Sequence, residues 1–188
     1  MQKAVKKHKA RQTVNIEAPI DLPPMEPINP PAIVQTVDSR PSSSLKNFYN
    51  NQKLLDTVVA CVVLEAGGEG TQGMQAINEV LTNRARYTTG NDSLSSKYKV
   101  AVQPKQFSCF NKGIDTAIAI AKKHPKWAEA KKIVESVPTN ITNGSRFYYA
   151  NKGRNAIRLP SWGNTFLKRG AKTVQIGNHL FFYGFKGI

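Results

Sequence analysis

Glu65 is the residue whose place in the sequence best suits acid catalysis. It ends an apolar, helix-like run that begins near residue 54, and the glycine-rich segment 66–70 follows at once. Burial raises the pKa of a carboxyl group, so a glutamate at the end of a buried helix can stay protonated near neutral pH and donate its proton. The glycines would let a polymer approach the backbone closely. The alternative is a glutamate that only faces solvent at a helix end.

Two further glutamates lie close to Glu65 in the sequence. Glu69 follows four residues later, across the glycine-rich turn, and could assist Glu65, orient the loop or face water. Glu79 falls on a stretch that already has an apolar stripe, so we expect a surface position for it. Residues 51–188 contain only eight acidic residues. That scarcity fits a mechanism with one principal acid/base.

The other reactive side chains are few. The sequence has two cysteines, Cys61 and Cys109, and three histidines, His8, His124 and His179. No cysteine spacing typical of a metal site occurs, and we expect neither a metal nor a cofactor. Cys61 lies in an apolar run and is interpreted as a core residue, while its pairing with Cys109 stays open. His179, after a predicted turn, is either a hydrogen-bonded structural residue or a group that positions a substrate.

The surrounding residues predict a mainly helical fold. Apolar residues recur over 52–66 at helical spacing and nearly encircle the helix, which indicates burial and an end at Gly67-Gly68. The further helices that the spacing predicts cover about residues 71–87, 93–102, 114–121 and 127–137.

The pattern changes after Pro138. Residues 145–151, SRFYYAN, predict an aromatic strand after a turn. Two β-rich runs within 171–185 flank Gly177-Asn178, which is typical of a hairpin. The expected fold class is therefore α+β, a mainly helical domain with a small β element near the C-terminus.

Residues 1–50 differ in composition from residues 51–188. Seven of the eleven prolines lie in 1–50, and residues 18–43 are rich in Pro and Ser. Such a stretch favours an extended or disordered linker. We therefore expect a basic tail over 1–50 and one folded catalytic domain over 51–188. The tail is either unattached or an arm that docks on a larger assembly.

The positive charge lies mainly on the expected domain. The chain carries a formal charge of +15, and residues 1–50 contribute seven Lys/Arg and four Asp/Glu. Residues 51–188 therefore hold twenty basic and eight acidic residues, a net of +12. This charge favours a polyanionic partner, which could be nucleic acid, an anionic membrane or a cell wall. No stretch reaches the roughly 18 to 20 apolar residues of a membrane span, and we expect no signal peptide.

A spaced set of motifs resembles one enzyme family. The segments LEAGGEGTQGMQAINEVLTNRA, QPKQFSCF, FYYAN, PSW and IGNHLFFY together resemble the bacterial and phage cell wall hydrolases of the spore cortex-lytic type. The resemblance covers about residues 54–183 and none of 1–50. It implies a lysozyme-like fold similar to that of the lytic transglycosylases.

The resemblance also implies a reaction and its residues. Family members cleave peptidoglycan between N-acetylmuramic acid and N-acetylglucosamine, and the first glutamate of their motif, Glu65 here, is the general acid/base. A lytic transglycosylase closes a 1,6-anhydro ring on the muramoyl residue, which requires no second carboxylate. Glu69 is expected to support Glu65. The residues expected to line the sugar cleft are Gln106, Phe107, Ser145, Tyr148 and His179.

The sequence departs from the family pattern at two places. Ser145-Arg146-Phe147-Tyr148 stands where the family usually has a Thr-His-Phe-Tyr run. Phe182 stands where a tyrosine is expected after the His-x-Phe segment, and Tyr183 follows it. Phe107, Phe147 and Trp162 could stack on sugars or could belong to the core.

Other functions remain open from the sequence. A hydrolytic muramidase would use the same Glu65, and a wall peptidase would use Cys109 with His179. A basic nucleic-acid-binding or structural virion protein is the non-enzymatic alternative, although no reader motif is present. We expect a phage lysin, either an endolysin that passes from the host cytoplasm to the wall or an enzyme carried in the virion. In the virion case residues 1–50 would contact other virion proteins.

Overall fold

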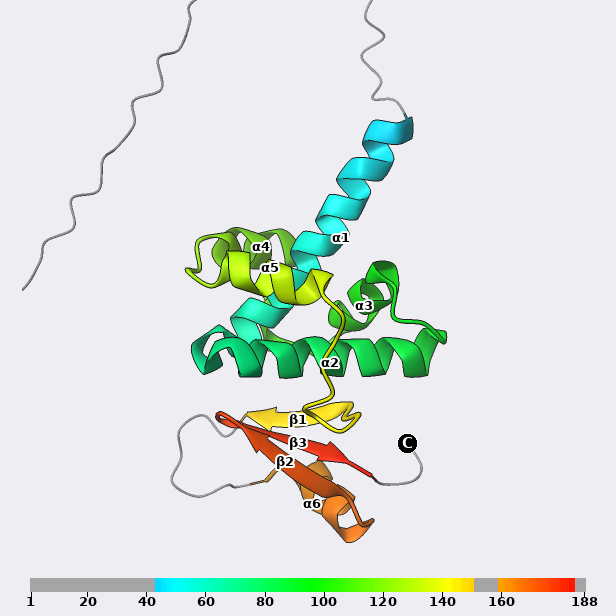
Figure 1. The fold of residues 1–188 in the computed structure, drawn as a ribbon, viewed down its shortest axis with the longest axis vertical. Coiled ribbons are helices and arrows are strands. Elements are labelled where there is room, and N and C mark those ends of the chain that lie inside the picture. The colour runs from blue at the N-terminus through cyan, green and yellow to red at the C-terminus, as the bar shows by residue number, and fades with distance from the viewer. Residues whose placement is uncertain (1–42, 151–158, 185–188) are drawn as a thin grey trace, which may run out of the picture. The chain divides into compact units, whose positions relative to one another are not determined.

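A computed structural model describes residues 43–150 and 159–184, and Figure 1 shows their arrangement. The helices are α1 (Ser43–Ala66), the 3₁₀ turn η1 (Gly67–Glu69), α2 (Gly70–Thr89), α3 (Leu94–Ala101), the 3₁₀ turn η2 (Ser108–Phe110), α4 (Ile114–Lys122), α5 (Trp127–Glu135) and α6 (Ser161–Lys168). The strands are β1 (Phe147–Ala150), β2 (Lys172–Ile176) and β3 (His179–Tyr183). The expected mainly helical fold with a small β element near the C-terminus is confirmed.

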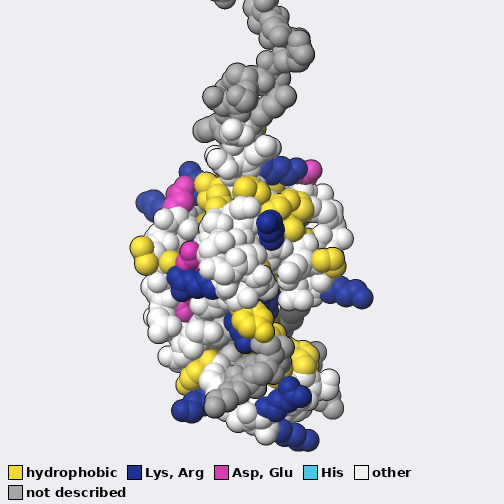
Figure 2. All heavy atoms as spheres, turned by 90° about the vertical axis from the view of Figure 1, so that its right-hand side faces the viewer, with side chains coloured by type: hydrophobic (Ala, Val, Ile, Leu, Met, Phe, Trp, Pro, Cys, Tyr) yellow, Lys and Arg dark blue, Asp and Glu magenta, His cyan; other side chains and the backbone are white. Residues whose placement is uncertain are grey.

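The surface of the folded part of the chain is strongly basic. Figure 2 shows one face on which Lys and Arg side chains are spread from end to end and Asp and Glu side chains are fewer. No described helix is long and apolar enough to cross a membrane.

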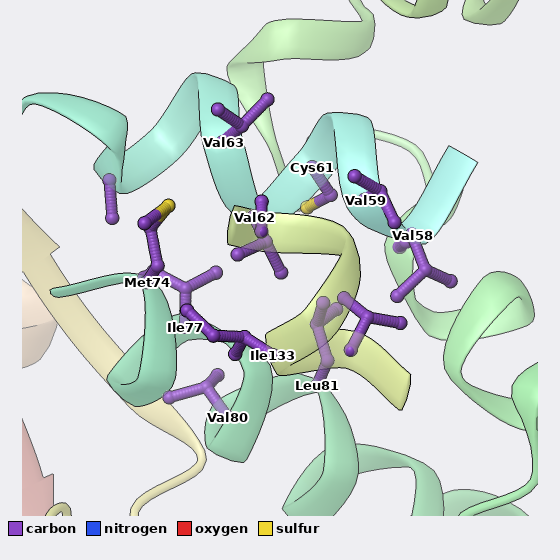
Figure 3. Close-up of a cluster of buried hydrophobic side chains, with 14 of the residues drawn as sticks. Val58, Val59, Cys61, Val62, Val63, Met74, Ile77, Val80, Leu81 and Ile133 are labelled. Atoms are coloured by element: carbon purple, nitrogen blue, oxygen red, sulfur yellow. The ribbon is translucent and has the colours of Figure 1, made fainter. Parts of the chain in front are cut away.

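The helical core forms around the second half of α1. Val58, Val59, Val62 and Val63 are buried, and they contact apolar residues of α2 and α5 (Figure 3). These valines recur at helical spacing, which is why the sequence predicted this part of α1. α1 begins at Ser43 rather than at residue 52, because no proline interrupts the chain between Pro41 and the end of α1 at Ala66. The rest of the predicted tail lies outside the described residues.

A glycine allows the chain to turn between α1 and α2. A Cβ atom on Gly67 would lie 2.7 Å from Cε1 of His124, closer than real Cβ contacts come. A larger residue after α1 would therefore require the His124 ring, in the loop before α5, to move. Glu65 and Glu69 lie two residues before and two residues after Gly67 in the sequence.

The three strands form an antiparallel sheet in the order β1-β3-β2. β3 is buried along most of its length, and its successive side chains point to opposite faces of the sheet. Phe181 joins the helical core, whereas Phe182 packs with Phe166 of α6 in a second cluster. The sheet therefore lies between the helical core and α6, as Figure 1 shows. The hairpin predicted at Gly177-Asn178 is confirmed.

Two sequence expectations differ from the structure. No element was predicted over 161–168, but α6 forms there, with Pro160 at its N-cap position and its Phe166 buried. The apolar residues of α6 span only about one and a half helical turns, which is too short for a helical period to be recognised in the sequence. Glu79 was expected at the surface, and this was wrong, because only 2% of it is exposed.

Candidate active site

The acidic residues of the folded part separate into two groups. Five of the eight form ion pairs with lysine or arginine, namely Asp56, Asp92, Asp115, Glu129 and Glu135. The remaining three, Glu65, Glu69 and Glu79, form no ion pair with a described residue. Each accepts hydrogen bonds from uncharged donors instead. These three carboxylates are therefore the ones that the fold positions without a neutralising side chain.

Glu65 lies in the last turn of α1 and is half-buried. The backbone N–H of Cys109 donates to its Oε1 at 3.3 Å, and the hydroxyl of Tyr148 donates to its Oε2 at 3.0 Å. One donor comes from η2 and the other from β1. The position of the carboxyl group is thus set by three elements that are far apart in the sequence.

Tyr148 is suited to hold Glu65 over the whole physiological pH range. Burial raises the pKa of its phenol, and the nearby Glu65 carboxylate raises it further. The phenol therefore keeps its proton and can only donate toward Glu65. Its ring packs against the rings of Phe181 and His179, with centroids 5.7 and 5.2 Å away, so its direction is fixed.

Glu69 holds the β hairpin against the helices. Its Oε2 accepts from the backbone N–H of Asn178 at 2.8 Å, and its Oε1 accepts from Asn178 Nδ2 at 3.0 Å. A Cβ atom on Gly177 would collide with this carboxylate, and Gly177 also has a positive φ of 57°. The turn sequence Gly-Asn therefore serves the contact with Glu69 as well as the hairpin.

His179 is the first residue of β3 and only 3% of it is exposed. Its Nδ1 is buried and has no hydrogen-bond partner among the described residues. Burial lowers the pKa of the imidazole, against a smaller opposite effect from Glu69 and Glu65, so the ring is neutral near pH 7. A neutral ring offers one acceptor and one donor.

These residues surround a cleft of about 390 Å³ between the helices and the sheet. We call it the Glu65 cleft. It is lined by Leu64, Glu65, Glu69, Ser108, Cys109, Ile120, Ala150, Asn178 and His179.

A second hollow lies next to the first. It measures about 330 Å³, and Tyr148, the residue that donates to Glu65, forms part of its wall. We call it the Trp162 hollow. It is lined by Arg84, Lys105, Gln106, Phe147, Tyr148, Trp162 and Phe166.

The predicted site residues fall into three places. Glu65, Glu69 and His179 line the Glu65 cleft, and Gln106 and Tyr148 line the Trp162 hollow. The other two lie beneath these surfaces. Phe107 is 3% exposed and belongs to the helical core, and Ser145 is 1% exposed. The Ser145 hydroxyl lies 2.8 Å from the carbonyl oxygen of Phe147 and 2.7 Å from that of Phe182, at the edge of the sheet.

Sequence reasoning missed several residues of the site. Asn178 was noted only as a turn residue, and Arg84 was not singled out. The backbone of Cys109 was not considered at all, because a main-chain donor carries no signal in the residue type. The position of Asn178 directly before His179 was a signal that could have been used.

The two cysteines are free thiols. Cys61 is buried in the core, which raises the pKa of its thiol, and a hydrogen bond with Cys109 adds to this rise. Cys109 and His179 line the same cleft. No group of three His, Cys, Asp or Glu residues able to hold a metal ion occurs in the part of the chain that the structure describes.

A comparison with protein families places the folded part of the chain. Residues 68–182 match the family model described as Cell Wall Hydrolase. The match includes Glu69, Gln106, Tyr148 and His179, and it begins three residues after Glu65. Comparisons with curated proteins and with solved structures gave no match.

Proposed function

The chain belongs to the cell wall hydrolase family, and we propose that it cleaves the β-1,4 bond between N-acetylmuramic acid and N-acetylglucosamine, with Glu65 as general acid/base. Family membership supports an enzyme that acts on peptidoglycan. The observation that carries the finer proposal is the setting of Glu65. Its carboxyl group lines a cleft, has no ion-pair partner among the described residues, and is oriented by donors from η2 and β1.

Glu65 is a better acid/base than Glu69. Both oxygen atoms of Glu69 accept hydrogen bonds from Asn178, at 2.8 and 3.0 Å, so that carboxylate already has a structural task. The contacts of Glu65 come from one main-chain donor and one phenol and leave the group at the cleft surface. A single cleft carboxylate without such a structural task favours a lytic transglycosylase over an enzyme that needs two.

In the proposed reaction Glu65 first donates its proton to the glycosidic oxygen. The bond between C1 and that oxygen breaks, and its electron pair stays on the leaving oxygen. The Glu65 carboxylate then takes the proton from the C6 hydroxyl of the same muramoyl residue. The C6 oxygen bonds to C1 and closes a 1,6-anhydro ring, so Glu65 is again protonated and no water is consumed.

The test is digestion of purified wall sacculi, with the soluble products weighed by mass spectrometry. We compare the wild type, Glu65→Gln, and Glu135→Gln as a matched control at an exposed site. Loss of general acid catalysis lowers the rate about 10²- to 10⁴-fold in Glu65→Gln only. Anhydromuramoyl ends from the wild type support the transglycosylase. Reducing muramic ends would instead indicate a hydrolytic muramidase that uses the same Glu65.

A wall peptidase is the second candidate, because Cys109 and His179 line one cleft. It would release peptides rather than glycan fragments and would lose all activity in Cys109→Ser. Under the proposed function Cys109→Ser retains most of its activity, because the contact with Glu65 comes from the main chain of Cys109. Absence of any release by the wild type would instead favour a nucleic-acid-binding or structural protein.

We also propose that the enzyme is a phage lysin, either an endolysin or a virion-borne enzyme. The proposal rests on the resemblance to bacterial and phage enzymes and on the basic, proline-rich residues 1–50. Mass spectrometry of purified phage particles tests it. Peptides of this chain in the particles support the virion-borne form, and their absence removes that form.

A further inference from the structure

The Trp162 hollow has a composition unlike that of the Glu65 cleft. Among the described residues that line it, two are basic, four are aromatic and none is acidic. Tyr148 joins the two cavities, because it lines the hollow and donates to Glu65 in the cleft. A molecule long enough to extend past Tyr148 would therefore contact both.

Arg84 brings an uncompensated positive charge to the hollow. Its Nε–H donates to the carbonyl oxygen of Arg146 at 2.6 Å, and its Nη1 donates to Oε1 of Gln106 at 3.1 Å. A guanidinium has five N–H donors, so three have no partner among the residues that the structure describes. The group forms no ion pair there either. Burial lowers the pKa of Arg84, and no described carboxylate beside it offsets this effect.

Aromatic rings hold the Arg84 guanidinium in one place. Its Cζ lies 5.2 Å from the ring centroid of Phe107 and 5.8 Å from that of Phe147. Such contacts stabilise the cation but do not use its in-plane donors. The spare donors therefore remain available to a planar group with two oxygen atoms, which a guanidinium binds with two parallel hydrogen bonds.

Lys105 adds a second cation at the same hollow. It is exposed, has no acidic partner among the described residues, and has a positive φ of 63°. Residues other than glycine rarely adopt this conformation, and it persists only where the surrounding structure imposes it. Its backbone conformation is thus set by the turn, and its side chain lines the same hollow as Arg84.

Trp162 supplies a flat apolar surface. The side chain is 38% exposed, and its ring is supported by Phe166 and Phe182 at centroid distances of 5.4 and 5.5 Å. A rigid, partly exposed ring beside polar groups is suited to the face of a sugar, which is apolar on its C–H side.

From these contacts we propose that the Trp162 hollow is a second saccharide subsite that binds an acidic muramoyl residue, with the sugar ring on Trp162 and a carboxylate of its peptide on Arg84 and Lys105. The proposal rests on the proposed function, because it takes the same glycan strand past Tyr148. It adds a requirement that the reaction at Glu65 does not have, namely a free anionic group on the substrate. A phosphate of a wall polymer is the other source of the same chemistry.

The charge is tested by binding rather than by cleavage. Glu65→Gln protein is titrated by calorimetry with a muropeptide tetrasaccharide, with the same compound after amidation of its carboxyl groups, and with a polyglycerol phosphate. Lys105→Gln and Lys132→Gln are added to this background, and each removes one exposed lysine. We expect Lys105→Gln to weaken binding of the acidic compound about fivefold and to leave the amidated compound unaffected. Lys132→Gln, on α5, has no effect on either.

Arg84→Lys separates the geometry of the cation from its charge. It keeps the positive charge and loses the paired donors, so binding of the acidic compound falls about tenfold. Thermal unfolding of the variant identifies any loss of fold. Because Lys105 is exposed, Lys105→Gln keeps the test decisive even if Arg84→Lys fails to fold.

The stacking part of the proposal is tested on α6. Trp162→Ala is compared with Leu167→Ala, which truncates another exposed apolar residue of the same helix. Trp162→Ala weakens binding of both the acidic and the amidated compound, by about tenfold, and Leu167→Ala leaves both unchanged.

Three results would overturn the proposal. Equal binding of the acidic and amidated compounds would show that the hollow does not recognise a carboxylate. Saturable binding of the polyglycerol phosphate alone would show that the ligand of the hollow is a phosphate of a wall polymer. Equal effects of Lys105→Gln and Lys132→Gln would show that the net charge of the protein, rather than the hollow, attracts the acidic compound. In each case sacculi are still cleaved through Glu65 if the proposed function holds, so the two failures are distinguishable.

Discussion

At the scale of single residues, three glutamates within fifteen positions have three different tasks. Glu65 faces a cleft, Glu69 holds a hairpin turn, and Glu79 is buried under the segment before β1. Because the three residues are of one type, their hydrogen-bond partners determine what each of them does. Donors that orient a carboxylate and leave it accessible favour chemistry, whereas donors that cover it favour structure.

Tyr148→Phe tests the orientation of Glu65. The variant keeps the ring packed against Phe181 and removes only the hydroxyl that donates to Glu65. We expect the rate of sacculus cleavage to fall about tenfold to a hundredfold. Far-ultraviolet circular dichroism and the midpoint of urea unfolding should change little. Tyr149→Phe, which removes a neighbouring hydroxyl of β1, is the control and should retain its activity.

His179 predicts how stability depends on pH. Burial lowers the pKa of this imidazole below its ordinary value of 6.5, although Glu69 and Glu65 face it and oppose the shift. Well above pH 6.5 the ring is neutral in both the folded and the unfolded chain. As the pH falls below 6.5, the unfolded chain takes up a proton that the folded chain resists, so the free energy of unfolding decreases.

The measurement is urea unfolding of the wild type and His179→Gln at about pH 7.5 and about pH 5.5. The variant should lose less stability than the wild type between these two pH values. Equal losses would show that other groups account for the whole effect.

At the scale of elements, the connections are set by buried polar contacts that the sequence does not reveal. Glu79 of α2 accepts from the backbone N–H groups of Ile141 and Thr142, each at 2.9 Å, and from the hydroxyls of Thr139 and Thr142. This one carboxylate fixes the segment that leads from the helices into β1. The aromatic strand that carries Tyr148 therefore begins at a defined place.

Glu79→Ala should be strongly destabilising. It leaves four donors without their acceptor, two of them on the buried Thr142, which costs about 3 kcal/mol of unfolding free energy. Urea unfolding provides the measurement, and Glu135→Ala at an exposed position should change the stability by less than about 0.5 kcal/mol. A similar small change in Glu79→Ala would contradict the structural task of Glu79.

Gly177→Ala tests the contact between Glu69 and the hairpin. The new methyl group meets the Glu69 carboxylate and also occupies a positive φ, so we expect a loss of about 2 kcal/mol. In a Glu69→Ala background the collision disappears and only the cost of φ remains, about 1 kcal/mol. A double-mutant cycle in urea measures the difference. Equal costs in both backgrounds would mean that Glu69 does not restrain the turn.

The sequence predicted the elements better than the site. The valines of α1 and the turn at Gly177-Asn178 carry periodic or turn-specific signals, and the second half of α1 and the hairpin formed as expected. α6 escaped prediction because its burial depends on a sheet formed elsewhere in the chain. Glu79 was misplaced because its acceptor role depends on Thr139 and Thr142, some sixty residues away. Long-range polar contacts leave no local pattern.

At the scale of the whole molecule, the net charge of +12 on residues 51–188 governs the encounter with the wall. The basic side chains are spread over the face in Figure 2 rather than gathered at one point. Such a field attracts a polyanion over about 10 Å at an ionic strength of 0.1 M. It raises the local concentration of enzyme on the wall but does not determine which bond is cleaved.

This field predicts a salt effect that depends on the substrate. Raising the ionic strength from about 0.05 M to about 0.5 M should lower the rate on intact sacculi severalfold, because screening weakens attraction to the anionic wall. The rate on a short, amidated glycan fragment should change by less than about twofold. Rates measured in parallel on the two substrates decide the matter, and equal salt effects on both would assign the loss to the enzyme itself.

The residues that hold Glu65 and Glu69 are made late in synthesis. Tyr148 follows Glu65 by 83 residues, and Asn178 follows Glu69 by 109. A nascent chain on the ribosome therefore contains the helical half of the protein, with both carboxylates, well before β3 exists to seat Tyr148 and to present Asn178. We expect such a chain, or one released early, to have no assembled cleft. The cell that makes this wall-degrading enzyme is thus exposed to its chemistry only after the last strand has been translated and has docked.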